Sequence, residues 1–432
     1  NSAIAVTATF SESVTGFVVG DVSVTNGIAS GFSGSGTTYN FTVTPSAEGS
    51  VTISVAANMA QDSASNQNIA SNTLTYTYDT TPPSSPSISI NSGASYTTTS
   101  LVDLSLSATG SPTNMYVTNT AGCASGGAWE TYATTKTAWT LSQTNATATV
   151  YVKFKDAAGN EYTCTSDTII HDNTAPTLTV VSMSPASPSS TQTPTANFTL
   201  SEASTVTLYN SSTCTTAISS SSSKASGAQT LITNTLSDGT YNIFAKAVDS
   251  ATNASSCTQI ALSYVIDTTV PTVTNVTSST ANGSYLAGSV ISIQVAFSEP
   301  VYVTGTPTLT LETGVNDAVV NYTSGTGTNT LTFNYTVQAG HTSSDLDYTS
   351  TSALTPGTSL RDLASNNVNF TLPAPGSAGS LAANKALVVD TTAPSLTLSS
   401  STANPTNANI SVTATFSESV TGFDATDLSI TN

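Results

Sequence analysis

A five-residue motif divides the chain at domain-sized intervals. Its fullest copy is Asp390-Thr391-Thr392-Ala393-Pro394, and three close copies begin at Asp79, Asp172 and Asp267. The first residues of the four copies are 93, 95 and 123 positions apart. Because a domain usually holds roughly 50 to 250 residues, this spacing predicts one domain between each pair of copies. The predicted boundaries are 1–80, 81–173, 174–268, 269–391 and 392–432.

Apolar and polar residues alternate with a period of two in every segment. In the first segment, Ile4, Val6, Ala8 and Phe10 form such a run, and Gly, Ser and Asn residues separate it from the next runs. This alternation places one face of a strand toward a core and the other toward solvent, as in half-buried antiparallel strands. About 80 residues with this many short strands indicate a β-sandwich.

The two ends of the chain repeat each other. Residues 407–432 align with residues 1–26 without a gap, and 18 of the 26 positions are identical. The last segment also contains an apolar run at Leu396 and Leu398 that has no counterpart in the first segment, which therefore lacks its first strand. One interpretation is that the chain is a window in a longer array of repeats. The other is that a terminal strand of one chain completes the open sandwich of the next chain.

The net charge of the chain argues against two classes of binding partner. Only 7 Lys and Arg residues accompany 25 Asp and Glu residues, so the formal net charge is −18. Nucleic acids and anionic membrane surfaces bind basic patches, so we expect neither as a partner. No run is long and apolar enough for insertion into a bilayer. Acidic side chains suit calcium, which takes oxygen ligands, but they also keep a long fibre soluble.

The four cysteines fall in pairs within two segments. Cys123 and Cys164 are 41 residues apart in the second segment, and Cys214 and Cys257 are 43 residues apart in the third. The chain has no Cys-x-x-Cys motif, and neither histidine is close in sequence to a cysteine pair, which argues against a zinc site. We therefore predict one disulfide, Cys123–Cys164 or Cys214–Cys257, in each segment and an oxidising compartment.

Three motifs together resemble a known family. They are the Asp-Thr-Thr-Ala-Pro punctuation, Phe-Ser-Glu near a domain start, and Asp-Ala-Ala-Gly-Asn at Asp156–Asn160, with looser copies beginning at Asp62, Asp249 and Asp362. This pattern resembles the bacterial Ig-like repeats of giant surface adhesins. The resemblance implies an all-β fold, an elongated tandem array of Ig-like antiparallel β-sandwich domains joined by short linkers.

The resemblance also implies a non-catalytic stalk or fibre in an extracellular, cell-surface or secreted protein. The partners would be neighbouring repeats of the same chain or of other copies. Contact with a host surface, an abiotic surface or another cell would use modules outside this stretch. An alternative is the protomer of a self-assembling filament with lateral or donor-strand contacts. A third is a carbohydrate-binding accessory module, which needs an exposed aromatic platform, although Trp129 and Trp139 fit core and hairpin packing better.

Acidic residues recur at the same places in successive segments. In an Ig-type sandwich the B–C loop, the F–G loop and the entering linker share one end of the domain. We therefore expect converging oxygen donors at each junction, and calcium as the ligand that relieves their repulsion and stiffens the joint. The alternative is that these Asp and Asn side chains cap tight turns. The predicted sets are Asp172, Glu202 and Asp249; Asp267, Glu299 and Asp362; Asp390 and Glu418; and the weaker pair Asp79 and Asp156, where Ala108-Thr109-Gly110 supplies no acid.

The sequence predicts no catalytic site. His171 and His341 lie in different segments, and neither belongs to a recognised motif with Ser and Asp. Asp345 and Asp347 alternate on an expected strand, where a solvated face explains them without a reaction. The chain is therefore predicted not to be an enzyme.

Overall fold

The computed structural model describes residues 2–404, 406 and 409–431, and it is nearly all β, with 51% of residues in strands and 4% in helices. Four separate hydrophobic clusters form the cores of the four segments between the punctuation motifs. By its internal contacts the chain divides into two compact units. Residues 1–177, 202–204 and 248–255 make the first unit, and the remaining residues make the second.

The first segment is a sandwich of two small sheets. Antiparallel strands β1 and β3 form one sheet, and β2, β4 and β5 form the other. The alternation read from the sequence places Val43, Val51 and Ile53 in the core between the sheets. The strands are β1 (Ile4–Val14), β2 (Val22–Thr25), β3 (Gly27–Pro45), β4 (Gly49–Val55) and β5 (Leu74–Tyr78).

The second segment packs a three-stranded sheet, in the order β11-β8-β6, against a five-stranded sheet, in the order β10-β9-β12-β13-β7. Val150, Val152 and Phe154 alternate along β12 and are fully buried between the sheets. The strands are β6 (Ser84–Ile90), β7 (Tyr96–Thr97), β8 (Leu101–Thr109), β9 (Asn114–Thr118), β10 (Trp129–Thr131), β11 (Thr135–Thr140), β12 (Ala146–Lys155) and β13 (Thr165–His171).

The third segment has the same two-layer plan, with sheets β14-β15-β18 and β17-β16-β19-β20. Ala196, Phe198 and Leu200 on β15 face Ile243, Ala245 and Ala247 on β19 within one core. The strands are β14 (Leu178–Ser184), β15 (Thr195–Leu200), β16 (Ser204–Tyr209), β17 (Ser222–Lys224), β18 (Gly227–Ile232), β19 (Gly239–Val248) and β20 (Thr258–Ile266).

The fourth segment is larger because it adds strands and a short helix to the same plan. Helix α1 (Leu381–Asn384) buries Leu381, and Asn384 donates a hydrogen bond to the carbonyl of Val276, 2.7 Å away. The strands are β21 (Val273–Ser278), β22 (Gly283–Tyr285), β23 (Val290–Thr304), β24 (Thr308–Leu311), β25 (Ala318–Ser324), β26 (Thr328–Thr336), β27 (Thr342–Ser343), β28 (Leu354–Thr355), β29 (Ser359–Arg361) and β30 (Leu387–Asp390).

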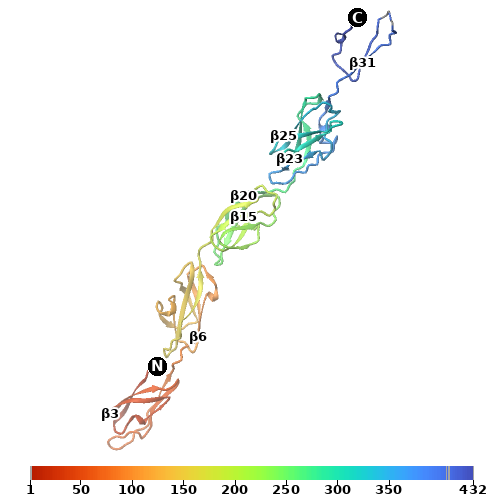
Figure 1. Ribbon diagram of the computed structural model, residues 1–432. Helices are drawn as coiled ribbons and strands as arrows, with labels where there is room; N and C mark the ends of the chain where they lie inside the picture. Colours follow the sequence, from red (N-terminus) through yellow and green to blue (C-terminus); the bar gives the residue numbers. More distant parts are fainter. Residues whose placement is uncertain (1, 405, 407–408, 432) are drawn as a thin grey trace. The chain divides into compact units, whose positions relative to one another are not determined.

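The first strand of a segment has the same pairing in the second, third and fourth segments. Figure 1 labels this strand, β6, in the second segment. It pairs antiparallel with the next long strand, as β6 does with β8, β14 with β15 and β21 with β23. A short continuation then pairs in parallel with the last strand of the domain, as β7 does with β13 and β22 with β30. In the final stretch, β31 (Leu396–Ser399) pairs antiparallel with β32 (Thr413–Phe416) in the same way.

Candidate metal centres at the domain junctions

Each Asp-x-x-x-Asn motif folds into the same tight turn at the start of an F–G loop. In the third segment, Asp249 accepts hydrogen bonds from the backbone N–H and the side-chain Nδ2 of Asn253, both at 2.8 Å. Asp62, Asp156 and Asp362 make the same pair of bonds to the Asn four residues later. Such side-chain bonds to local backbone groups favour turns over strands. The turn-forming role that the sequence offered as an alternative is therefore present in all four motifs.

The asparagine of each motif also fastens the linker that enters the domain. Asn160 donates through Nδ2 to the carbonyl of Asp79 at 3.0 Å, Asn253 to that of Asp172 at 2.9 Å, and Asn366 to that of Asp267 at 2.8 Å. Because the other hydrogen of Nδ2 is held by the Asp of the motif, one amide group joins the turn to the linker. We call this contact the asparagine clamp. Sequence reasoning placed these residues near each other but did not predict the bond.

The linker aspartates form a turn of their own. In each of the four copies the Asp side chain accepts a hydrogen bond, 3.0 Å long, from the backbone N–H of the Thr two residues later. This bond uses one carboxylate oxygen of Asp79, Asp172, Asp267 or Asp390. Carboxylates have two oxygens with several acceptor positions, so the second oxygen can take another partner.

Two of the predicted acidic sets converge. Asp172 comes within reach of Glu202 and Asp249, and Asp267 comes within reach of Glu299 and Asp362. In each group one carboxylate oxygen from every residue lies within 4.8 Å of the others. Glu202 follows β15 by two residues, Glu299 lies within β23, and the Asp of each motif begins the F–G turn.

The electrostatics of the two groups are unfavourable for three ionised carboxylates. Burial raises the pKa of Glu202, and the nearby charges of Asp172 and Asp249 raise it further. Burial and the charges of Asp267 and Asp362 raise the pKa of Glu299 in the same way. Like charges held close together disfavour the ionised form unless a cation compensates them.

Glu299 also has a buried side-chain oxygen whose hydrogen-bonding capacity is not satisfied. Its Oε1 atom is buried and has no hydrogen-bond partner among the described residues. A buried carboxylate oxygen without a partner destabilises the fold, because it has lost its hydrogen bonds to water and makes no protein hydrogen bond in their place. Three carboxylates supply oxygen ligands of the kind that calcium takes, so the residues present fit this ion.

The other predicted ligands do not form such groups in the described part of the chain. Asp79 and Asp156 are joined through Asn160 but have no third acid, in agreement with the Ala108-Thr109-Gly110 sequence. Asp390 and Glu418 are both exposed, and neither belongs to a group of three converging acids. Among the residues that the structure describes, three acids converge only at the second-to-third and third-to-fourth junctions.

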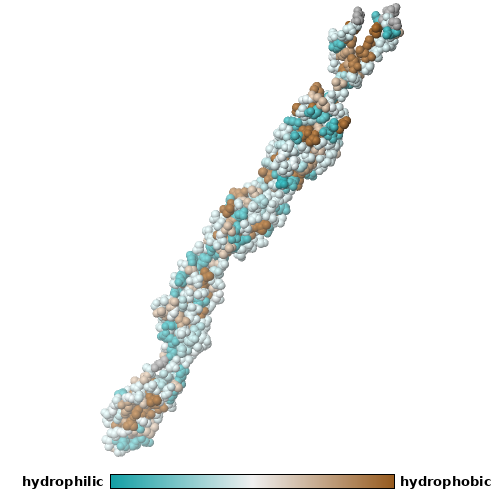
Figure 2. All heavy atoms as spheres, in the orientation of Figure 1, coloured by the Kyte–Doolittle hydropathy of each residue, from teal (hydrophilic) through white to brown (hydrophobic). Residues whose placement is uncertain are grey.

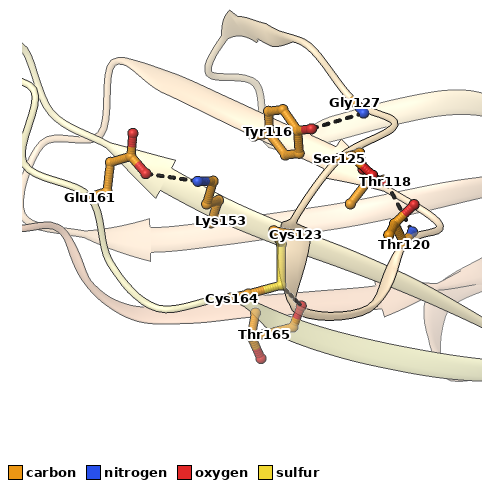
Figure 3. The surroundings of a disulfide bond; sticks show 10 residues. All are labelled: Tyr116, Thr118, Thr120, Cys123, Ser125, Gly127, Lys153, Glu161, Cys164 and Thr165. Carbon is orange, nitrogen blue, oxygen red and sulfur yellow. Dashed lines mark hydrogen bonds and ion pairs between the residues drawn. A yellow bond between two sulfur atoms is a disulfide. The ribbon is translucent and has the colours of Figure 1, made fainter.

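Both predicted disulfides are formed. Cys123–Cys164 joins the loop after β9 to the start of β13, where Thr118 donates to the carbonyl of Ser125 and orders the same loop (Figure 3). Cys214–Cys257 joins the equivalent parts of the third segment, with the same Cα–Cα distance of 5.8 Å. The described cysteines include no free thiol.

The tryptophans are packed rather than open to a ligand. Trp139 packs against the core of the second segment, and its Nε1 donates to Asn119 at 2.9 Å. Trp129 lies beside Tyr116 on the outer face of the five-stranded sheet, and Lys155 places its Nζ 4.3 Å from the ring centroid. This distance is that of a cation–π contact, which accounts for the half-buried ring by packing within the domain.

Both histidines have structural partners, whereas the expectation for Asp345 and Asp347 was wrong. Neither aspartate lies in a strand, and only Asp345 is exposed to solvent. His171 accepts a hydrogen bond from the backbone N–H of Asn145, and His341 is 2.8 Å from the hydroxyl of Tyr335. Asp347 is buried and accepts from the backbone N–H groups of Tyr348 and Gly376. No helix in the described residues has the length and apolarity needed to cross a membrane.

Comparison with known proteins agrees with this architecture. Residues 1–78 and 175–268 each match a model of a bacterial Ig-like domain. No curated protein matches the chain. Among solved structures, the chain is similar to the Bacteroides ovatus mixed-linkage glucan utilization locus SGBP-B in complex with mixed-linkage heptasaccharide. That match has 11% identity, covers 72% of this chain and 71% of the other, and has a TM-score of 0.15, which is too low to support an argument about function.

The fold and the two matches define the class of protein as a tandem of β-sandwich modules. Residues 1–78 and 175–268 are each similar to a bacterial Ig-like domain, so the chain contains domains of this kind. Such domains are typically non-catalytic structural modules, and together with the disulfides they are characteristic of extracellular or surface proteins.

Proposed function

We propose that this chain is part of the stalk or fibre of a large bacterial surface adhesin, and that calcium ions stiffen two of its domain junctions. The observation that carries the proposal is the convergence of a linker aspartate with a Glu and an Asp of the following domain at both junctions. A stalk must resist bending between its domains. A cation bound by oxygen ligands from both sides of a junction limits bending at that junction.

The asparagine clamp provides a restraint that needs no metal. It joins the F–G turn to the linker at all three junctions between complete domains. Calcium adds to this restraint only where a third acid is present. The junction at Asp79 therefore has the clamp without a cation, and Glu48 also holds this linker by accepting hydrogen bonds from the backbone N–H and the hydroxyl of Thr80, 3.0 and 2.6 Å long. The other two junctions combine the clamp with a cation.

Replacement of Asn366 by Ala tests the clamp. The change removes the hydrogen bonds to the carbonyl of Asp267 and to Asp362, so we expect the unfolding free energy of the fourth domain to fall by about 1–2 kcal/mol. Hydrogen–deuterium exchange of the full chain reports this domain separately. Asn66→Ala is the matched control, because Asn66 makes the same turn bonds to Asp62 in the first domain.

The two variants differ in what they do to a linker. Faster exchange at the backbone after Asp267 is expected for Asn366→Ala, and Asn66→Ala should accelerate exchange in its own turn only. An equal, purely local effect of both variants would show that the asparagine forms a turn without restraining the linker.

Calcium titration of the intact chain tests the metal sites. We expect uptake of two ions per chain, one for each converging group, and a rise in melting temperature that a chelator reverses. The chain with both Glu202→Gln and Glu299→Gln is the control and should lose the uptake. If calorimetry detects no calcium binding to the unmodified chain and chelation leaves the melting curve unchanged, the metal sites are refuted, whereas the stalk assignment and the clamp are unaffected.

A further inference from the structure

The hairpin of β25 and β26 in the fourth domain is paired only near its turn. The two strands pair at Tyr322 with Phe333 and at Ser324 with Thr332, and among the described residues their pairing goes no further. The outer edges of both strands are held, because β25 also pairs with β24 and β26 also pairs with β23. The facing edges of β25 and β26 therefore separate away from the turn.

A cleft of about 510 Å³ lies where the two strands separate. Residues 317–323 line one side, and residues 334–336 line the other together with Gln338 and His341. If the pairing continued in the register of Tyr322 and Phe333, Val319 would lie opposite Thr336. The cleft is thus bordered by residues that a fully paired hairpin would join to each other.

The backbone N–H groups of Val319 and Thr336 point into this cleft. Along a strand, successive N–H groups point to opposite sides. The N–H of Tyr322 forms its hydrogen bond on the β24 side, and the N–H of Val337 forms its bond on the β23 side. Val319 and Thr336 lie an odd number of positions away, so their N–H groups face the cleft instead. Neither N–H has a backbone partner within the described part of the chain.

Side chains satisfy part of these edges in place of a strand. Gln338 donates through Nε2 to the carbonyl of Thr336 at 3.0 Å, and the hydroxyl of Thr323 accepts from the N–H of Asn334 at 3.3 Å. The amide of Gln338 presents to this carbonyl the same kind of N–H group that a peptide bond would present. Val319 leaves an apolar side chain 64% exposed beside the opposite edge. Strand edges of this kind are templates for pairing with another chain.

The residues that line the cleft favour a peptide without acidic side chains. Asp317 is exposed at one end of the lining, and the lining includes no Lys or Arg. Apart from Val319, the other exposed side chains of the lining carry amides or hydroxyls. Figure 2 shows hydrophilic and hydrophobic residues together on the visible surface of the fourth domain. Because the chain also has a net charge of −18, it repels an acidic segment but not a neutral or basic one.

We propose that this cleft binds an extended peptide segment of neutral or basic composition from another protein, as a strand added along residues 334–338. An extended peptide offers N–H and carbonyl groups at the spacing of the strand edges, so main-chain hydrogen bonds supply the affinity. A strand antiparallel to β26 runs parallel to β25, and sheets of mixed direction are common. This inference does not depend on the stalk function or on calcium.

A displayed library of random seven-residue peptides, selected on the intact chain, tests the proposal. The affinity of each enriched peptide is then measured by calorimetry for the unmodified chain and for Thr336→Pro. Proline removes the N–H that faces the cleft and leaves the pairing of β26 with β23 in place, because that pairing uses the other backbone groups. We expect the affinity to fall by about tenfold, as for the loss of a backbone hydrogen bond. Thr336→Val keeps the N–H, so this matched control should bind like the unmodified chain.

Val319→Pro repeats the measurement on the opposite edge, with Val319→Thr as its control, so the test survives if one proline variant unfolds. Melting curves of both proline chains check their folding. The proposal is overturned if no peptide is enriched, if acidic peptides are enriched, or if the enriched peptides bind the folded proline chains as tightly as the unmodified chain. Binding of a neutral oligosaccharide that Asn334→Ala abolishes and Thr336→Pro leaves intact would overturn it in favour of a glycan site.

Discussion

Reduction of the two disulfides is expected to lower the unfolding free energy of the second and third domains by about 4 kcal/mol each. The estimate follows from the loops that the bonds close, which span 41 and 43 residues, through the entropy that a cross-link removes from the unfolded chain. A loss of this size is a large fraction of the stability of a small domain. The two domains should therefore become the least stable parts of the chain when it is reduced.

Hydrogen–deuterium exchange of the intact chain, with and without reductant, measures this effect domain by domain. The first and fourth domains hold no cysteine and serve as internal controls. The double variant Cys214→Ser and Cys257→Ser should reproduce the loss in the third domain only. The entropic argument fails if reduction accelerates exchange equally in all four domains, or if neither cysteine-containing domain responds.

The sequence was sufficient to predict the all-β fold of tandem sandwiches. Period-two alternation is a direct consequence of strands that have one buried face, and the punctuation motif recurs wherever the chain leaves a sandwich. The additional structure of the fourth domain was not predicted. Helix α1 has only four residues, too few to show a helical period, and its position depends on the bond from Asn384 to Val276.

Sequence patterns indicated which acidic side chains lie close together. They did not indicate the hydrogen bonds from side chains to backbone carbonyl groups. Asp172, Glu202 and Asp249 could be grouped because the loops at one end of a sandwich are known from topology. The bond from Asn253 to the carbonyl of Asp172 could not, because every residue has a carbonyl and the acceptor leaves no mark in the sequence. The available sequence signal was that each linker Asp between these domains is followed, in the next domain, by an Asp-x-x-x-Asn motif.

Replacement of Glu299 by Gln is expected to have opposite effects with and without calcium. Without calcium, the neutral amide removes the repulsion by Asp267 and Asp362, so the fourth domain should become more stable at neutral pH. With calcium at about 100 times its dissociation constant, the unmodified chain gains about 2.7 kcal/mol from binding, and the variant loses most of this gain. The order of stability of the two chains should therefore reverse when calcium is added.

The pH dependence without calcium provides a second measurement of the same interaction. The raised pKa of Glu299 means that the folded domain holds a proton more tightly than the unfolded chain does. The destabilisation by this residue at neutral pH is therefore relieved as the pH falls through its raised pKa toward the ordinary glutamate pKa of 4.5. The Glu299→Gln chain should lack this recovery, and calcium should diminish it in the unmodified chain.

Glu12→Gln, at the same motif position in the first domain and outside both acidic groups, should change neither the calcium response nor the exchange of the fourth domain. Stability that stays in the same order at both calcium levels would mean that Glu299 is not a ligand and that the acidic groups serve only to shape the turns.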